Sequence, residues 1–361
     1  MATGSRERIA VAMSGGVDSS TVAAWLVAQG HEVIGLSMQL WSQTAPGGTA
    51  RGSCCAIDDR QDARRVAELL GIPFYVINLE EAFSSAVIAD FIATYAAGKT
   101  PNPCVRCNQS LKFVHLLAKA QALEATALAT GHYAVIRPTA TGKPGLWRGR
   151  DPAKDQSYFL FATPLTQLAN LHFPLGELTK EQTRALARQF GLHNAGKHES
   201  QDLCFVPDGD YQTFFKGHAP ELLVEGEIID LDGRVRGRHR GVGCYTIGQR
   251  HGLGIAAAYP LFVIAIDPSH RRLIVGPAEA LYKDRLEVTD INWLVHRPPD
   301  ARQPVAVKIR YAGVPQPAII EPLGDPNRVV VRFAEPQRAV TPGQACVFYA
   351  ADQVLGGGWI L

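Results

Sequence analysis

The stretch RIAVAMSGGVDSSTVAAWL, residues 8–26, is the most informative part of this chain about its fold. Its first six residues form an apolar run typical of a buried strand in a parallel sheet, and residues 18–28 have the apolar spacing of a helix. Between them, Gly15 and Gly16 permit backbone angles that other residues avoid, so several N–H groups can point into one concavity at the positive end of the helix. Such a turn is an anion site, most simply a phosphate site.

The two commonest phosphate-binding motifs do not match this turn. A Walker A loop has four residues between its glycines and then a lysine, and a dinucleotide fingerprint reads Gly-x-Gly-x-x-Gly. A simple tight turn with a capping serine would account for Ser14 and one glycine, but not for the whole run GGVDSS at residues 15–20. We therefore predict a phosphate loop of a different class.

The segments that follow alternate between strand and helix patterns. We predict strands at residues 31–38, 73–79 and 125–136, and helices at residues 58–70, 80–97 and 111–123. This alternation predicts an α/β fold with a doubly wound parallel sheet. Ligands of such sheets lie beyond the carboxyl ends of the strands, so we expect Ser14–Ser19, Met38, Gly131 and His132 to share one crevice.

The pattern changes from about residue 208, where glycine becomes frequent and helical runs become rare. Short apolar runs separated by proline and glycine turns after residue 281 predict an antiparallel β-barrel. We predict a catalytic domain at residues 1–206, a small mixed central domain at 207–277 and the barrel at 278–361. In the central domain, the arginines at 234, 236, 238 and 240 would share one face of a strand, either as a phosphate-facing stripe or as an ordinary solvated face.

The composition is that of a globular protein, with 46% hydrophobic and 19% charged residues in 361. A formal charge of +2 neither requires nor excludes nucleic acid as a partner. No basic leader with an apolar core opens the sequence and no apolar run has membrane-spanning length, so we expect a cytoplasmic protein without a membrane partner.

A second informative stretch is GKTPNPCVRCNQSLKF, residues 98–113. Its two prolines predict a stiff loop that places Cys104 and Cys107 at or near a helix N-terminus, where a thiolate is favoured as a nucleophile or soft-metal ligand. Cys204 is the obvious distant partner, although a buried small hydrophobe is an equally good interpretation of it. The three cysteines could also hold three irons of a [4Fe–4S] cluster, whereas zinc would need two further ligands. The other four cysteines, at 54, 55, 244 and 346, are predicted to be structural.

Six segments together resemble the bacterial tRNA-specific 2-thiouridylase (MnmA/TrmU) family of the PP-loop ATP pyrophosphatase superfamily. They are SGGVDSS (14–20), TPNPCVRCN (100–108), ATGHYA (129–134), KDQSYFL (154–160), TIGQRHGLG (246–254) and TPGQACVFY (341–349). The loop alone indicates only the superfamily, but the ordered set is far more specific. The resemblance implies an enzyme, a tRNA-uridine 2-sulfurtransferase, that adenylates the C2 oxygen of the wobble uridine with ATP, releases pyrophosphate and then displaces AMP with a persulfide sulfur.

The resemblance also implies roles for individual residues. Cys107 would be the nucleophile, and Cys204 would carry the persulfide. The ATP-binding set would be Ala12, Met13, Ser14, Gly15, Gly16, Val17, Asp18, Ser19, Met38 and Gly131. The target-base set would be Asn102, Pro103 and Cys104, and the tRNA-binding set His132, Lys154, Asp155, Gln156, Arg310, Tyr311 and Gln344. Some relatives carry aspartate in place of Cys104, so a general-base role does not transfer to that position.

Several expectations follow for cofactors and partners. We expect ATP with Mg²⁺, a wobble-uridine tRNA, an upstream sulfur-donor protein and a monomer. One alternative is the same thiolation carried out through a [4Fe–4S] cluster on Cys104, Cys107 and Cys204. An alternative of another class is a PP-loop synthetase acting on a small molecule, which would not need the cysteines.

Overall fold

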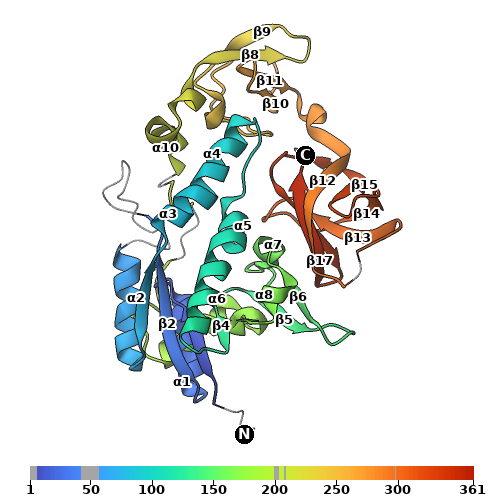
Figure 1. Ribbon diagram of the computed structural model, residues 1–361. Helices are drawn as coiled ribbons and strands as arrows, with labels where there is room; N and C mark the ends of the chain where they lie inside the picture. The colour runs from blue at the N-terminus through green and yellow to red at the C-terminus, as the bar shows by residue number, and fades with distance from the viewer. Residues whose placement is uncertain (1–5, 42–56, 199–202, 207–208, 297) are drawn as a thin grey trace. The chain divides into compact units, whose positions relative to one another are not determined.

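The computed structural model describes residues 6–41, 57–198, 203–206, 209–296 and 298–361 (Figure 1). The chain divides into two compact units. The first comprises residues 1–86, 104–209 and 352–354, and the second comprises residues 87–103, 210–351 and 355–361. The domain boundaries expected at residues 206 and 277 stay predictions. No helix in these described ranges is both long and apolar enough to span a bilayer.

The first unit is built on a five-stranded sheet of order β3-β2-β1-β4-β7, in which all neighbouring strands are parallel. The strands are β1 (Arg8–Ala12), β2 (Glu32–Gln39), β3 (Phe74–Asn78), β4 (Ala127–Ala129) and β7 (Leu171–His172). The longer helices are α1 (Val17–Ala28), α2 (Ile57–Leu70), α6 (Phe113–Ala122) and α9 (Lys180–Gln189). The short segments are α3 (Glu80–Phe83), α5 (Pro103–Cys107), the π-helical η2 (Asn108–Lys112), α7 (Ser157–Leu160), α8 (Leu165–Leu168) and η3 (Pro174–Glu177). The predicted α/β fold with a parallel sheet is confirmed.

Helices cover both faces of this sheet. Alternate residues of β1, including Ile9 and Val11, lie in one core with buried side chains of α1, α2 and α9. Helix α6 contacts β1 and β4, but none of its residues belongs to that core, so α6 covers the opposite face. The period-two alternation of buried strand residues therefore produces the doubly wound arrangement.

A hairpin completes the first unit. Strands β5 (Ala134–Pro138) and β6 (Pro144–Arg148) pair antiparallel, and Gln353 and Val354 of β17 (Gln353–Ile360) add to β6. The strand predicted at residues 125–136 is thus two strands, β4 and β5, separated by the turn that carries Gly131 and His132.

The second unit contains a four-stranded mixed sheet of order β10-β11-β8-β9. Its strands are β8 (Gly226–Asp230), β9 (Val235–His239), β10 (Phe262–Asp267) and β11 (Arg272–Gly276). Next to it in sequence lie α10 (Tyr211–His218), η5 (Pro220–Leu223), η6 (Val242–Cys244) and η7 (Ala278–Leu281). Phe91 of α4 (Ala89–Ala96), which follows the π-helical η1 (Ser84–Ile88), stacks on Tyr211 and Phe215 of α10.

The arginines of β9 do not form the uniform stripe expected from their spacing. The register with β8 shifts between Val235 and Gly237, so Arg236 lies in a bulge and the period of two is broken. Arg236 is paired with Asp230 at 2.7 Å, and Arg234 is paired with Asp232 at 3.0 Å. These acidic partners offset the positive charge that a phosphate-facing stripe would need.

The C-terminal part of the second unit is a closed antiparallel barrel. Six strands follow the order β12-β15-β14-β13-β16-β17, and β17 pairs back with β12 to close the sheet. The five strands other than β17 are β12 (Tyr282–Trp293), β13 (Gln303–Lys308), β14 (Gln316–Pro322), β15 (Arg328–Arg338) and β16 (Ala345–Ala350). Alternate side chains such as Val288, Val331 and Phe348 fill the interior, which confirms the predicted barrel.

Candidate active site

The turn between β1 and α1 is shaped by its first glycine. Gly15 has φ +80°, and a Cβ atom at this position would lie 1.9 Å from the backbone oxygen of Asp59. No residue with a side chain fits there, which explains this glycine. Helix α1 begins at Val17, directly after the turn. The unpaired N–H groups and the positive dipole end of the helix therefore lie at the turn.

Side chains brace the turn from both ends. Ser19 Oγ accepts a hydrogen bond from the Ser14 backbone N–H at 3.1 Å and lies 3.2 Å from Ser14 Oγ. From the far side, Asn194 Nδ2 donates to the Gly15 carbonyl at 3.0 Å and to Ser20 Oγ at 2.9 Å. The turn is therefore held in place without a ligand, and such preorganisation lowers the ordering cost of binding.

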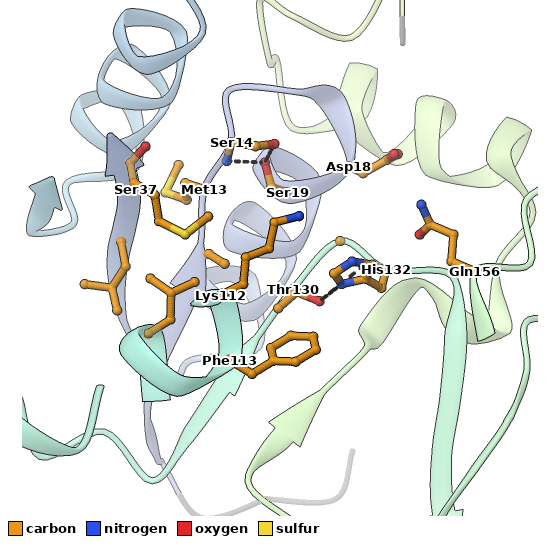
Figure 2. A pocket seen from close by; sticks show the side chains of 15 residues that line it. Met13, Ser14, Asp18, Ser19, Ser37, Lys112, Phe113, Thr130, His132 and Gln156 are labelled. Atoms are coloured by element: carbon orange, nitrogen blue, oxygen red, sulfur yellow. Dashed lines mark hydrogen bonds between the residues drawn. The ribbon is translucent and has the colours of Figure 1, made fainter. Parts of the chain in front are cut away.

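A pocket of ≈ 200 Å³ opens at this turn (Figure 2). It brings together seven of the ten residues expected to bind ATP: Ala12, Met13, Ser14, Asp18, Ser19, Met38 and Gly131. The other three, Gly15, Gly16 and Val17, form the turn itself and the start of α1. The crevice expected from the strand ends is present, because it lies where β1, β2 and β4 end.

Two residues expected at the tRNA, His132 and Gln156, also line this pocket. His132 Nδ1 lies 2.7 Å from Thr130 Oγ1, and Gln156 Oε1 accepts a hydrogen bond from the Tyr133 backbone N–H at 2.9 Å. Burial, and secondarily the ammonium group of Lys112, lowers the pKa of His132 to about 3. A neutral imidazole therefore faces the pocket at physiological pH.

Three lysines lie near the glycine turn, and two of them are paired with aspartates. Lys112, the last residue of η2, extends into the pocket (Figure 2). Lys180, the first residue of α9, places its Nζ 2.7 and 2.8 Å from the two carboxylate oxygens of Asp18, which also accepts a hydrogen bond from the Tyr133 hydroxyl at 2.9 Å. Lys197 Nζ contacts the Gly15 carbonyl at 3.4 Å and pairs with two aspartates of α2.

Sequence reasoning missed Lys180 as a site residue. The Thr179–Gln182 capping box marks the start of α9, but it contains no sign that this helix reaches a residue 162 positions earlier. For Lys112, the sequence indicates only that it follows the cysteines within the run CNQSLKF at residues 107–113, and not that it lines the pocket.

The cysteine stretch is helical rather than a loop from Pro103 onward. Cys104 is exposed on α5, whereas Cys107, its last residue, is only 6% exposed. Five residues of π-helix then connect Cys107 to Lys112, and such π-helical insertions occur often at functional sites. The same continuous segment therefore carries the predicted nucleophile and a cation that lines the pocket at the glycine turn.

Cys204 is half-buried, and the ring of the following residue, Phe205, packs edge-on against Phe83 at 5.7 Å. Within the described residues, no three His, Cys, Asp or Glu side chains gather into a group that could hold a metal ion. Cys104, Cys107 and Cys204 are thus not arranged as a cluster site in this structure. Cys346 is fully buried in the barrel, where burial raises the pKa of its thiol. Cys54 and Cys55 lie outside the described residues.

Asp155 and Lys154, also expected at the tRNA, lie in the loop before α7. Asp155 is 2% exposed, and its carboxylate accepts hydrogen bonds from the backbone N–H groups of Gly149 and Ser157, so it organises its own loop. Lys154, its neighbour, is half-buried. Burial and these internal hydrogen bonds favour a structural role for the carboxylate, and a tRNA contact of Asp155 stays a prediction.

In the barrel, Arg310 Nη2 donates to the carbonyls of Arg338 and Ala339 at 2.6 and 2.5 Å. Tyr311 is 39% exposed, and its ring lies 5.5 Å from the ammonium of Lys308. Gln344 donates to two carbonyls of the segment that precedes Cys104. Of these three residues, Tyr311 presents the most open surface.

Comparison with known proteins places the chain in a family. Family models match three successive segments: the "tRNA methyl transferase HUP domain" over residues 7–208, the "tRNA methyl transferase PRC-barrel domain" over 212–277 and the "Aminomethyltransferase beta-barrel domain" over 283–360. Among solved structures, a 4-thiouridine synthetase–RNA complex with bound ATP is 14% identical and covers 56% of this chain and 46% of its own, at a TM-score of 0.37, which is too low to bear on function.

Curated relatives are far more similar. The "tRNA-specific 2-thiouridylase MnmA" of Magnetococcus marinus is 60% identical over 98% of this chain and 99% of the relative. The protein of the same name from Geotalea uraniireducens is 53% identical over 98% of this chain and 95% of the relative. With a glycine turn at the head of a parallel sheet, a cysteine helix leading into its pocket and this full-length similarity, the chain belongs to the MnmA family of tRNA-specific 2-thiouridylases.

Proposed function

We propose that this chain is an ATP-dependent tRNA-uridine 2-sulfurtransferase that replaces the C2 oxygen of the wobble uridine with sulfur. The observation that supports this most directly is the continuity of one helical segment from Cys107 to Lys112, which links a sulfur nucleophile to a phosphate-binding pocket. The relatives named tRNA-specific 2-thiouridylase, which match over nearly their whole length, support the choice of tRNA as substrate.

The first step would activate the base. The uridine O2 attacks the α-phosphorus of ATP, the bond from that phosphorus to the bridging oxygen breaks, and pyrophosphate leaves. The amides of the Gly15–Gly16 turn would hold the departing phosphates, because they are fixed donors at a positive helix end. Lys112 would balance the charge that develops there.

Magnesium would enter with the nucleotide. Asp18 is the one carboxylate among the residues that line the described pocket, and its side chain is 26% exposed. Mg²⁺ is commonly held by one or two carboxylates together with substrate phosphates, so this donor set fits the ion. The ion would neutralise phosphate charge, and Lys180 would hold the Asp18 carboxylate in position.

The second step would transfer sulfur. The terminal sulfur of a persulfide on Cys204 attacks C2 and AMP leaves, so the base is joined to Cys204 through a disulfide. Attack by the Cys107 thiolate on the Cys204 sulfur then releases 2-thiouridine and leaves a Cys107–Cys204 disulfide, which an external thiol reduces. A thiolate is suited to both the attack and the exchange. Because Cys107 is only 6% exposed, the segment must open for this step.

The cluster alternative gains no support from the arrangement of the three cysteines, and we derive no step through a [4Fe–4S] group. Iron and acid-labile sulfide analysis after anaerobic purification separates the two routes. If protein without iron thiolates tRNA at full rate, the cluster route is excluded.

An upstream protein that donates persulfide sulfur and a monomeric enzyme remain part of this proposal. A mixture of the chain with a cysteine-desulfurase-type donor should thiolate tRNA faster than sulfide alone. Sedimentation with and without tRNA would give the oligomeric state.

The decisive assay is ATP-dependent thiolation of an unmodified tRNA transcript with a sulfide or persulfide donor. Cys107→Ser and Cys204→Ser should each abolish 2-thiouridine formation, whereas Cys244→Ser, a half-buried cysteine of the second unit, serves as the matched control. A small-molecule synthetase would instead keep its activity in Cys107→Ser. Absence of thiolated tRNA from the intact chain in both aerobic and anaerobic preparations would contradict the proposal.

A further inference from the structure

The segment that precedes Cys104 is fastened to the C-terminal barrel within the second unit. The Thr100 backbone N–H donates to the Pro342 carbonyl at 2.9 Å. The Gln344 side-chain amide donates to the carbonyls of Thr100 and Pro101 at 3.1 and 2.9 Å. Three hydrogen bonds therefore connect two stretches that lie about 240 residues apart in sequence.

Gly343 lies so close to the segment before Cys104 that it has no room for a side chain. It has φ +86°, and a Cβ atom there would lie 2.8 Å from the Thr100 carbonyl oxygen and 3.0 Å from Cβ of Lys99. Because no larger residue fits without displacing the segment, a glycine is required both by the backbone angle and by the space. We call residues 342–344 the clasp.

The clasp is itself rigid. The Gly343 N–H donates to the Ile360 carbonyl at 2.8 Å, and the Ile360 N–H donates to the Gln344 carbonyl at 3.0 Å. The clasp is thereby tied to β17, one of the strands that close the barrel. A rigid closed sheet is a suitable support for residues that must be held within a fraction of an ångström.

The clasped segment depends on this support because its own hydrogen-bonding capacity is low. Pro101 and Pro103 have no N–H, so neither position can donate a backbone hydrogen bond to hold the segment in place. Its residues 101–103 are nevertheless buried, and buried carbonyls need donors. Gln344 is the donor for the carbonyl of buried Pro101 and for that of half-buried Thr100.

We propose that Gln344 and Gly343 are positioning residues for the thiolation reaction, which hold the Asn102–Pro103 segment so that the target base meets the sulfur chemistry at the following helix. This rests on the proposed function and revises the role that the family resemblance gives to Gln344, because its amide hydrogens are directed at the protein's own carbonyls and not outward to tRNA.

Two variants disrupt the clasp by different chemistry. Gln344→Met keeps the side-chain length and neutrality but removes both donors, and Gly343→Ala leaves Gln344 intact but pushes on Thr100. The matched control is Gln316→Met, a half-buried barrel glutamine whose amide donates to the nearby Val314 carbonyl at 3.2 Å. For each variant we would measure kcat and KM for thiolation, Kd for tRNA and for ATP, and hydrogen exchange of the Thr100 amide.

We expect Gln344→Met and Gly343→Ala to lower kcat by about 10- to 100-fold, since a displacement of about 1 Å can cost that much. The Kd values should stay within about threefold of the parent, Thr100 exchange should quicken at least about tenfold, and Gln316→Met should match the parent. A higher tRNA Kd with unchanged kcat in Gln344→Met, together with a parent-like Gly343→Ala, would mean that Gln344 contacts tRNA and would overturn the inference. Unchanged kcat in both variants would also overturn it.

Failure of the proposed function would be recognised separately, because the parent chain would then form no 2-thiouridine. The exchange measurement at Thr100 needs no activity and still tests the clasp. If Thr100 exchanges at the parent rate in both variants, the clasp does not hold the segment.

Discussion

Replacing Lys180 by methionine would test the charge pair at the head of α1. Lys180 and Asp18 have side chains 11% and 26% exposed, with both carboxylate oxygens within 2.8 Å of the ammonium. Removal of one partner from a fully buried pair costs about 3–5 kcal/mol, because the other charge is left uncompensated. Asp18 keeps partial solvent access and the hydrogen bond from Tyr133, so we expect Lys180→Met to lower the free energy of unfolding by about 2–3 kcal/mol.

The assay is urea unfolding followed by tryptophan fluorescence, to which Trp25, one of five tryptophans, contributes from its place against the core of the first unit. An exposed lysine of α10, Lys216, provides the control, because Lys216→Met should change stability by less than about 0.5 kcal/mol. Asp18→Asn in the Lys180→Met background should restore much of the loss, since no uncompensated charge remains. In the absence of Mg²⁺, ATP should bind Lys180→Met more weakly, because the bare carboxylate repels phosphate.

A loss below about 0.5 kcal/mol in Lys180→Met would refute this reasoning, as would a double variant that is less stable than either single one. The first result would mean that water replaces the ammonium at no net cost. The second would mean that the two side chains stabilise the unit independently of each other.

Three further outcomes are expected. Gly131→Ala would place a Cβ 2.9 Å from Cβ of Asp18, so ATP affinity should fall at least about tenfold and stability by about 1–3 kcal/mol; unchanged calorimetric binding would contradict this. Because the pKa of His132 is lowered in the folded state, the neutral imidazole contributes fully to stability above about pH 6.5, and this contribution is lost as the pH falls toward about 3. In His132→Gln, the Tm from thermal unfolding should therefore fall less steeply with decreasing pH over this range. Arg310→Met should lower the unfolding free energy by about 1–3 kcal/mol, since the guanidinium binds the Ala339 carbonyl; an unchanged Tm with weaker tRNA binding would indicate a tRNA contact instead.

Local patterns were reliable where the cause of the structure is itself local. The glycine turn, the buried strand before it and the helix after it follow from backbone freedom and apolar spacing within twenty residues. The same holds for the barrel, whose alternating strands and turns are short-range features. The structure differs from the prediction where an irregularity has no sequence signature. Examples are the bulge in β9 that displaces Arg236 and the π-helical segment that ends at Lys112.

The fold class, the glycine turn and the cysteine-bearing stretch can be predicted from the sequence, because each depends on neighbours along the chain. The distant groups that complete them become visible only in the folded chain. The ammonium of Lys180 reaches Asp18 across 162 residues, and Gln344 reaches Thr100 across 244. Such pairings depend on how helices and sheets pack, and packing is fixed by the summed burial of many side chains that no single segment encodes.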